Sequence, residues 1–504
     1  MLDYIIKQNS SYIDAMPKDV RKKYGQFFTS KETAIYMAGL YSIEKSSRTL
    51  SVLDTGAGSG ILSAALLERL QKIGIKAVNL TCYEVDENIL ELLKSNLEYI
   101  RENINITLKF QIINKNYITT QSFDFNHNGE CSTILSKYDL VIGNPPYLKL
   151  SKEAPEALSM PSICYGAPNM YFLFAAMALF NLKKDGEMVY IIPRSWTSGA
   201  YFKKFREYFL SEGKIEHIHL FISRNKVFEA EKVLQETIII KVRKTYVEPK
   251  VIEITSSNAN NDFNNIQSLL VPYNVAVSNT NFYVYLVTTK EESELLATLD
   301  TWKETLMDLG MKMKTGLTVD FRNRDLLRDK AESDTIPLFY SQHIKNGEII
   351  FPIGKSGEYL INSKSGLVQA NKNYLFVKRF SSKEEKRRLQ CGIYLAENFS
   401  NYSTISTQNK INFIDGTENE LAKVTVYGLY VLFNSKIYDM YYRILNGSTQ
   451  VNATEINTIP VPPISTINKM GIELMASEIL SEENCDRILE EYLNVEKRGS
   501  KRIS

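Results

Sequence analysis

The sequence predicts an α/β protein, with an open sheet in the first half of the chain and a second domain after it. Three observations support this fold class. Short apolar runs typical of buried strands recur up to about residue 246. A glycine-rich turn follows one of them, and another ends abruptly at Pro145 and Pro146. With 504 residues, the chain is long enough for two or more domains with their own cores.

Composition limits the classes of function. An apolar content of 44% and a charged content of 23% are typical of a soluble globular protein. The net charge of +2 neither supports nor excludes nucleic acid, so a DNA-binding surface would be a local patch. The five cysteines form no CxxC pair and the four histidines have no ligand spacing, which predicts a reduced compartment and no metal site. The polar start and the lack of long apolar runs predict a cytoplasmic protein without membrane contact.

A glycine-rich turn lies between the strand that begins at residue 51 and an amphipathic helix. Gly56 and Gly58 allow a ligand to approach the backbone closely, as they would in a dinucleotide site. Asp54 at the strand end argues against that alternative, because it would repel phosphate and attract the ammonium of S-adenosylmethionine. The next strand ends at Glu84, which can accept both ribose hydroxyls, while Asp86 suits a helix cap.

The stretch Asn144-Pro-Pro-Tyr147 follows a buried strand at residues 139–143. Prolines cannot continue a sheet ladder, so Asn144 is expected on a stiff turn at the carboxyl edge, where open α/β sheets bind ligands. The exocyclic amine of a base is a poor nucleophile because its lone pair is delocalised. If Asn144 and the Pro145 carbonyl each accept one N–H, that lone pair is freed, and Tyr147 supplies a flat face for a flipped base. A turn without chemistry is the alternative.

On these motifs, together with Gly25-Gln-Phe-Phe-Thr29, the sequence resembles the amino-methyltransferases that use S-adenosylmethionine. More narrowly, it resembles the γ-class N6-adenine DNA methyltransferases of bacterial restriction–modification systems, of Taq type and BsuBI/PstI type. The resemblance covers most of the chain. It implies a Rossmann-like methyltransferase domain with a mixed seven-stranded sheet at residues 1–246 and an α+β target-recognition domain at residues 286–504. The Asn- and Ser-rich residues 247–285 are predicted to be a linker.

The resemblance also implies partners and a cofactor-closing segment. The expected cofactor is S-adenosylmethionine and the expected substrate is double-stranded DNA, with a monomer acting beside a cognate restriction endonuclease. The segment at residues 17–45 would close over the cofactor, and Thr29 would contact its methionine part. In the alternative, Phe27 and Phe28 form a hydrophobic staple before a helix capped by Thr29 or Ser30.

Four further positions carry family roles. Where the family holds the cofactor adenine with an acid and an aromatic residue, this chain has Asn116 and Tyr117, with a plain loop as the alternative. Phe174 would be another adenine contact or a core residue. Phe202 would sandwich the target base opposite Tyr147, with a core role or Tyr201 as the alternatives.

The second half carries basic clusters at residues 312–328, 378–379 and 383–388, interleaved with aromatic residues. Such clusters usually form a solvated face, but they also suit a groove that follows phosphates. Gln450 and Asn452 have side chains that read adenine edges, and Ser448 and Thr449 suit phosphates, while a helix cap at Asn452 or Thr454 is an equal account. The basic residues expected to contact DNA are Arg322, Arg324, Lys378 and Arg379.

Two other functions stay open at this point. The same tetrapeptide serves enzymes that methylate RNA bases or a glutamine amide in translation factors, although those chains usually lack a large distal domain with basic clusters. A catalytically inactive DNA-binding subunit is the second alternative, because Asn116 departs from the family pattern. The chain shows no nuclease constellation of carboxylates and lysine.

Overall fold

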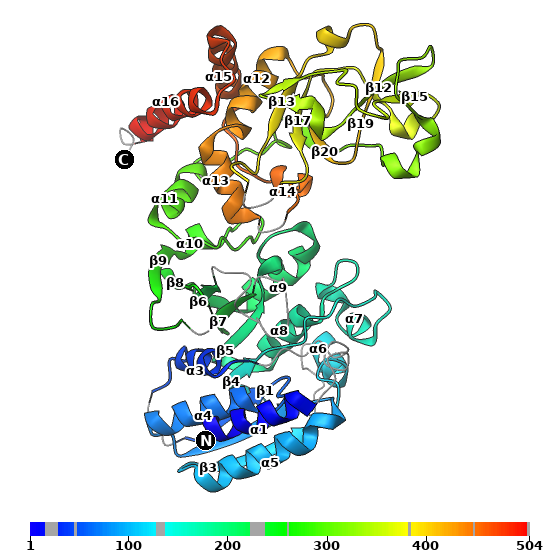
Figure 1. Ribbon diagram of the computed structural model, residues 1–504. Helices are drawn as coiled ribbons and strands as arrows, with labels where there is room; N and C mark the ends of the chain where they lie inside the picture. Colours follow the sequence, from blue (N-terminus) through cyan, green and yellow to red (C-terminus); the bar gives the residue numbers. More distant parts are fainter. Residues whose placement is uncertain are drawn as a thin grey trace. The chain divides into compact units, whose positions relative to one another are not determined.

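The computed structural model describes residues 1–15, 29–44, 48–127, 137–221, 237–259, 262–381, 385–446 and 449–500 (Figure 1). The chain divides into two compact units, Met1–Lys290 and Glu291–Ser504. Among the described residues, no helix is long and apolar enough to cross a membrane. Within the same ranges, no group of three or more His, Cys, Asp and Glu side chains is placed to hold a metal ion.

The first unit is built on a nine-stranded mixed sheet in the order β3-β2-β1-β4-β5-β7-β6-β8-β9. The strands β1 to β5 run parallel, and β7 is antiparallel to β5 and β6. The strands are β1 (Leu50–Asp54), β2 (Ala77–Tyr83), β3 (Thr107–Ile113), β4 (Tyr138–Gly143), β5 (Leu182–Pro193), β6 (Lys214–Phe221), β7 (Thr237–Arg243), β8 (Val251–Ser257) and β9 (Gln267–Pro272).

The prediction of a seven-stranded sheet was wrong, because the observed sheet has two more strands. The extra strands β8 and β9 lie in residues 247–285, which are therefore not a linker. β8 pairs with β6 in parallel, and β9 pairs with β8 as an antiparallel edge. Ile252, Ile254 and Val271 are buried, while the Asn- and Ser-rich sequence lies largely in the connection between the two strands. The first unit consequently ends at Lys290.

Helices cover both faces of this sheet (Figure 1). Leu2, Leu66 and Leu97, from three of them, share one core with residues of β1 and β2. Cap residues explain where two of these helices begin. The Ser30 side chain accepts the Thr33 amide, and the Asp86 side chain accepts the Asn88 amide. The helices are α1 (Leu2–Ala15), α3 (Lys31–Gly39), α4 (Ile61–Ile73), α5 (Glu87–Asn103), α6 (Ser122–Asn126), α7 (Pro155–Ser159), α8 (Met170–Asn181), α9 (Lys203–Glu212) and α10 (Tyr273–Ala276).

The second unit has mixed α and β structure. One sheet has the order β10-β20-β17-β18-β14-β13 and the other β11-β15-β12-β19-β16. Their strands are β10 (Met311–Thr315), β11 (Leu327–Arg328), β12 (Thr335–Phe339), β13 (Ile344–Lys345), β14 (Glu348–Ile349), β15 (Tyr359–Ile361), β16 (Gln369–Ala370), β17 (Tyr374–Lys378), β18 (Cys391–Tyr394), β19 (Thr404–Thr407) and β20 (Ile411–Gly416).

Glycines bring two helices of the second unit into close contact. A Cβ added to Gly428 would lie 2.0 Å from the Ile467 carbonyl oxygen. The chain after Pro463 forms two helices, which are separated at Glu478, where the backbone adopts a left-handed conformation with φ of 57°. The helices are α11 (Lys290–Leu299), α12 (Lys423–Phe433), α13 (Lys436–Leu445), α14 (Ala453–Ile456), α15 (Ile464–Ser477) and α16 (Glu482–Ser500).

Candidate active site

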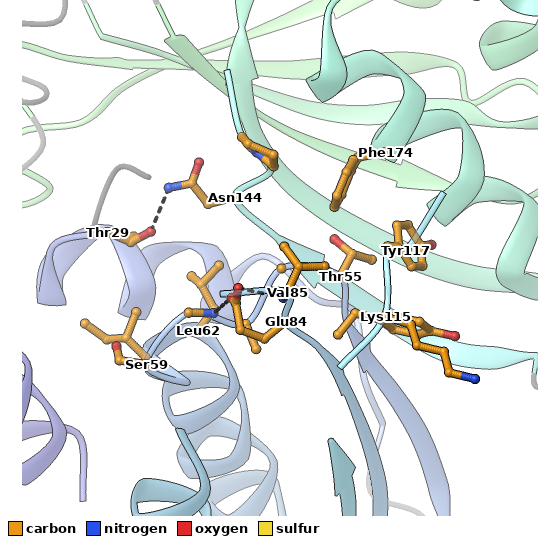
Figure 2. A pocket seen from close by; sticks show the side chains of 16 residues that line it. Thr29, Thr55, Ser59, Leu62, Glu84, Val85, Lys115, Tyr117, Asn144 and Phe174 are labelled. Atoms are coloured by element: carbon orange, nitrogen blue, oxygen red, sulfur yellow. Dashed lines mark hydrogen bonds between the residues drawn. The ribbon is translucent and has the colours of Figure 1, made fainter. Parts of the chain in front are cut away.

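A pocket with an empty volume of about 830 Å³ lies at the carboxyl ends of the central strands of the first unit (Figure 2). Parallel strands bring their carboxyl ends to one edge of a sheet, so segments far apart in sequence meet there. Eight of the thirteen residues predicted for catalysis and cofactor binding line this pocket: Thr29, Gly56, Gly58, Glu84, Tyr117, Asn144, Pro146 and Phe174. The other five, Asp54, Asn116, Pro145, Tyr147 and Phe202, are not among its lining residues.

The Glu84 carboxylate connects the glycine turn to the end of β2. It accepts backbone N–H groups from Gly58 at 2.8 Å, Val85 at 2.8 Å and Asp86 at 2.9 Å. Burial raises the pKa of Glu84, and these amides oppose that shift. A carboxylate has about four lone-pair positions, so roughly one remains for a ligand hydroxyl.

The glycine turn has room for a ligand. Gly58 adopts a φ of 53°, in the left-handed region that favours glycine. A Cβ added to Gly58 would meet nothing within 4 Å, and one added to Gly56 would make only an ordinary 3.8 Å contact with Phe174. The fold alone therefore leaves open space at this turn.

The structure corrects the expected position of Asp54. Its carboxyl group is fully buried, and Oδ2 accepts the Ser63 hydroxyl of α4 at 2.7 Å. Burial raises the pKa of Asp54 to about 7, against the lowering effect of the Ser63 hydrogen bond. Asp54 is thus buried and does not line the pocket.

The structure also corrects the expected role of Asn116. Its Oδ1 accepts the amides of Ile118 at 3.0 Å and Thr119 at 3.1 Å, and its Nδ2 donates to Glu156 of α7 at 2.7 Å. These bonds start a short 3₁₀ helix and fasten α7 to it, so the side chain is not available for a cofactor adenine. The plain-loop alternative describes Asn116 better.

Tyr117 and Phe174 are two of the three described aromatic residues that line the pocket, together with Tyr83. The ring centroids of Tyr117 and Phe174 are 5.2 Å apart, and the Tyr117 hydroxyl donates to Asn181 at 2.8 Å. Lys115, which the sequence reasoning missed, also lines the pocket. Its position two residues after the end of β3, at the same edge as the glycine turn, was the available signal. The other lining residues that were missed are Thr55, Ala57, Ser59, Ile61, Leu62, Tyr83 and Val85.

The Asn144 amide is held by hydrogen bonds at both ends. Nδ2 donates to the Thr29 hydroxyl at 3.1 Å, and the Tyr147 hydroxyl donates to Oδ1 at 2.9 Å. Figure 2 shows the Asn144 and Thr29 side chains pointing toward each other, joined by this hydrogen bond. Asn144 is half-buried and shares the pocket with the glycine turn. It is therefore neither sealed in the core nor turned away from the expected cofactor.

The residue before Asn144 has to be glycine. A Cβ on Gly143 would lie 2.8 Å from Thr55 Oγ1 and 2.8 Å from the Tyr190 ring. The Thr55 and Tyr190 hydroxyls are themselves hydrogen-bonded at 2.5 Å. The end of β4 is therefore packed tightly against β1 and β5, which sets where the tetrapeptide begins.

Tyr171 lies next to both rings of the expected base sandwich. Its centroid is 6.4 Å from that of Tyr147, with an interplanar angle of 86°, and 6.4 Å from that of Phe202, with an angle of 35°. Phe202 also packs against Phe172 at 5.8 Å and Tyr201 at 5.4 Å. These contacts place the half-buried Phe202 beside three other aromatic rings, and its role as a base platform stays a prediction.

In the second unit, two predicted DNA contacts are exposed and two are partly enclosed. Arg322 and Arg324 are exposed, and the Arg322 guanidinium lies 5.6 Å from the exposed Phe321 ring. Lys378 is half-buried. Arg379 donates to the Asn409 carbonyl at 3.0 Å and to Gln450 at 3.4 Å.

The remaining recognition candidates divide into structural and exposed groups. The Asn452 carboxamide accepts the Thr454 amide at 3.1 Å and caps α14, which agrees with the alternative account of this residue. Arg388 of the third basic cluster is fully buried and donates to Ser381 and Asn446, so it supports the fold. Gln450 and Thr449 are exposed. Phe27, Phe28 and Ser448 lie outside the described residues.

Comparison with known proteins agrees with this architecture. Residues 40–228 match the Eco57I restriction-modification methylase family. The chain is 32% identical to the type II methyltransferase M.PstI of Providencia stuartii, over 98% of this chain and 97% of that protein. It is 33% identical to the type II methyltransferase M.BsuBI of Bacillus subtilis, over 94% of each chain.

Among solved structures, the fold resembles that of the type IIL restriction-modification enzyme MmeI in complex with DNA, with a TM-score of 0.53 and 12% identity. That likeness covers 97% of this chain and 73% of the other, and it concerns the fold alone. The two sequence relatives are matched over nearly their whole lengths at more than 30% identity. The chain therefore belongs to the type II methyltransferases of restriction–modification systems, which take their methyl group from S-adenosylmethionine.

Proposed function

We propose that this protein is a site-specific DNA methyltransferase that methylates the N6 amine of an adenine flipped out of double-stranded DNA. It would act as the modification enzyme of a restriction–modification system. The observation that carries this proposal is that Asn144 and Pro146 line the same pocket as Gly58 and Glu84. An amide suited to gripping an amine thus lies beside a turn suited to a methyl donor.

The pocket fits S-adenosylmethionine. The open space at Gly58 accepts a ligand against the backbone, and Glu84 has acceptor capacity for a ribose hydroxyl. Tyr117 and Phe174 offer an aromatic surface for the adenine ring, and Thr29, the expected contact of the methionine part, also lines the pocket. When bound, this cofactor supplies a methyl group that its positively charged sulfur has already activated.

The residues of this chain would prepare the amine. The Asn144 amide oxygen and the Pro145 carbonyl accept its two hydrogens, which draws the nitrogen toward tetrahedral geometry and frees its lone pair. Proline suits this role, because its ring fixes φ and Pro145 is buried, so its carbonyl is held rigidly. Tyr147 and Phe202 would contact the faces of the base.

The second unit would read the DNA sequence. Arg322 and Arg324 are exposed and carry charge suited to phosphates, and Arg379 and Gln450 present hydrogen-bonding groups side by side. Lys378 would add a phosphate contact. Asn452 is left out of this set, because its carboxamide oxygen caps α14.

Methyl transfer to genomic DNA tests the proposal. The purified protein is incubated with unmethylated DNA and tritiated S-adenosylmethionine, and sequencing then locates the modified bases. We expect N6-methyladenine within one short sequence. Label in RNA or in a translation-factor glutamine would favour the two alternative substrates. Absence of S-adenosylmethionine binding would favour the inactive subunit, whose motivation weakens because Asn116 does not line the pocket.

A further inference from the structure

We propose that Thr29 is a positioning residue that holds the Asn144 amide in its working orientation. The Asn144 Nδ2 atom donates to the Thr29 hydroxyl at 3.1 Å. Thr29 lies 115 positions earlier in the chain and directly precedes Ser30, the N-cap of α3. This role differs from the cofactor contact expected of Thr29, and it rests on the proposed function.

The amide needs such a partner because only its oxygen end can accept an amine hydrogen. Rotated by 180°, it would present a donor to a donor. Tyr147 binds the oxygen end at 2.9 Å, and its hydroxyl also lies 3.0 Å from the Ile191 carbonyl. Thr29 binds the nitrogen end. Two hydrogen bonds from opposite ends fix the plane of the amide better than one.

Thr29 is itself held in place. It is 7% exposed, and the next residue, Ser30, caps α3 by accepting the Thr33 amide at 3.2 Å. Ala34 and Met37 of α3 are fully buried in the core of the first unit. A hydroxyl on the start of a rigid helix gives a defined position to the group that it binds.

Because Thr29 and Asn144 line one pocket, the Thr29 hydroxyl connects the wall of the cofactor site to the amide that grips the base. Loss of this hydroxyl would leave the pocket shape intact and allow the Asn144 amide to rotate. Misplacement of a reacting group by about 1 Å can cost roughly 10²-fold in rate. If Thr29 only contacted the cofactor, loss of its hydroxyl would instead lower the affinity for S-adenosylmethionine.

Two variants separate these roles: Thr29→Val, which keeps the shape and removes the hydroxyl, and Thr29→Ser, which keeps the hydroxyl. The measurements are the single-turnover methylation rate at saturating S-adenosylmethionine and the Kd of S-adenosylmethionine by calorimetry. We expect Thr29→Val to lower the rate by roughly 10- to 100-fold. We expect its Kd to stay within about threefold of the wild type, and Thr29→Ser to restore the rate.

The same variants give a readout other than activity. A 2-aminopurine base at the target position reports flipping, and we expect its signal to be retained in Thr29→Val. In an Asn144→Ala background, Thr29→Val is expected to change neither this signal nor the Kd, since the amide is gone. Thr29→Ala repeats the loss of the hydroxyl, and the circular dichroism spectra of both variants check that they fold.

Three results would overturn the inference: an undiminished rate in Thr29→Val, a loss confined to the Kd, or a failure of Thr29→Ser to restore the rate. Loss of cofactor binding in both Thr29→Val and Thr29→Ala would assign Thr29 to the cofactor instead. A wild-type protein that methylates no DNA would be a different outcome, because it would overturn the proposed function itself.

Discussion

The Glu84 carboxylate accepts the backbone N–H of Gly58 at 2.8 Å and thereby joins the end of β2 to the turn after β1. Glu84→Gln keeps the size of the side chain but replaces one acceptor oxygen with a donor. We expect S-adenosylmethionine affinity to fall by about 10- to 150-fold, since one charge-assisted bond is worth roughly 1.5–3 kcal/mol. Calorimetry measures the change. Glu87→Gln, exposed in the first turn of α5, is the matched control, and equal affinities in the two variants would contradict the prediction.

Asn144→Ala removes the amide that is proposed to grip the target amine. We expect the single-turnover rate to fall by about 10²- to 10³-fold or more, as when a group that stabilises the transition state is lost. S-adenosylmethionine affinity should change little, because the glycine turn and Glu84 remain. Asn103→Ala, at the exposed end of α5, serves as the control. Retained activity in Asn144→Ala would remove this residue from the mechanism.

Asn116→Ala should affect stability and not cofactor binding. The side chain starts a 3₁₀ helix and binds Glu156, so its loss is expected to cost about 1 kcal/mol of unfolding free energy. Urea denaturation gives that value, and calorimetry gives the affinity. A tenfold loss of S-adenosylmethionine affinity without loss of stability would return Asn116 to the cofactor site.

The buried Asp54 carboxyl group should make the stability of the cofactor-free protein depend on pH. Burial raises the pKa of Asp54 to about 7, so between about pH 4 and pH 7 the folded protein holds a proton that the unfolded chain has lost. Stability should therefore fall as pH rises through this window, by a contribution on the order of 4 kcal/mol at most.

Asp54→Asn is neutral at every pH and tests this contribution. We expect its melting temperature to exceed that of the wild type at pH 8 and to match it near pH 4. Glu91→Gln, at an exposed position of α5, should follow the wild-type curve. Parallel curves for wild type and Asp54→Asn would mean that Asp54 titrates normally in the folded state.

Arg322→Ala should weaken DNA binding without changing sequence preference. If the exposed Arg322 contacts a phosphate, affinity falls equally for cognate and unrelated duplexes. The slope of log affinity against log salt should then decrease in magnitude by about 0.9. Fluorescence anisotropy over a salt series measures this slope. Arg487→Ala, on α16 and paired with Glu491, is the control, and an unchanged slope for Arg322→Ala would exclude the contact.

The sequence predicted the features that depend on local pattern. The α/β class, the glycine turn and the strand that ends at Asn144 follow from apolar runs and from residues that cannot continue a ladder. Their meeting at one edge follows from parallel strand order. Because these signals are short-range, they placed eight site residues around one pocket.

The features that the sequence did not predict depend on distant partners. The Asn116 side chain is hydrogen-bonded to Glu156, forty residues away in the sequence. The Asp54 side chain is hydrogen-bonded to Ser63 of α4. The Tyr171 ring lies beside both Tyr147 and Phe202 because of where the tertiary fold places α8, which the local sequence does not reveal. β8 and β9 were missed because polar residues between them concealed two short strands.

The division of the chain at Lys290 has a consequence for how new specificities arise. Every pocket residue lies in the first unit, and every proposed reader of DNA sequence lies in the second. On the proposed function, recombination between relatives near this junction exchanges the target while the methylating machinery is inherited intact. Related enzymes can therefore change the DNA sequence that they methylate while they keep the same methylation site.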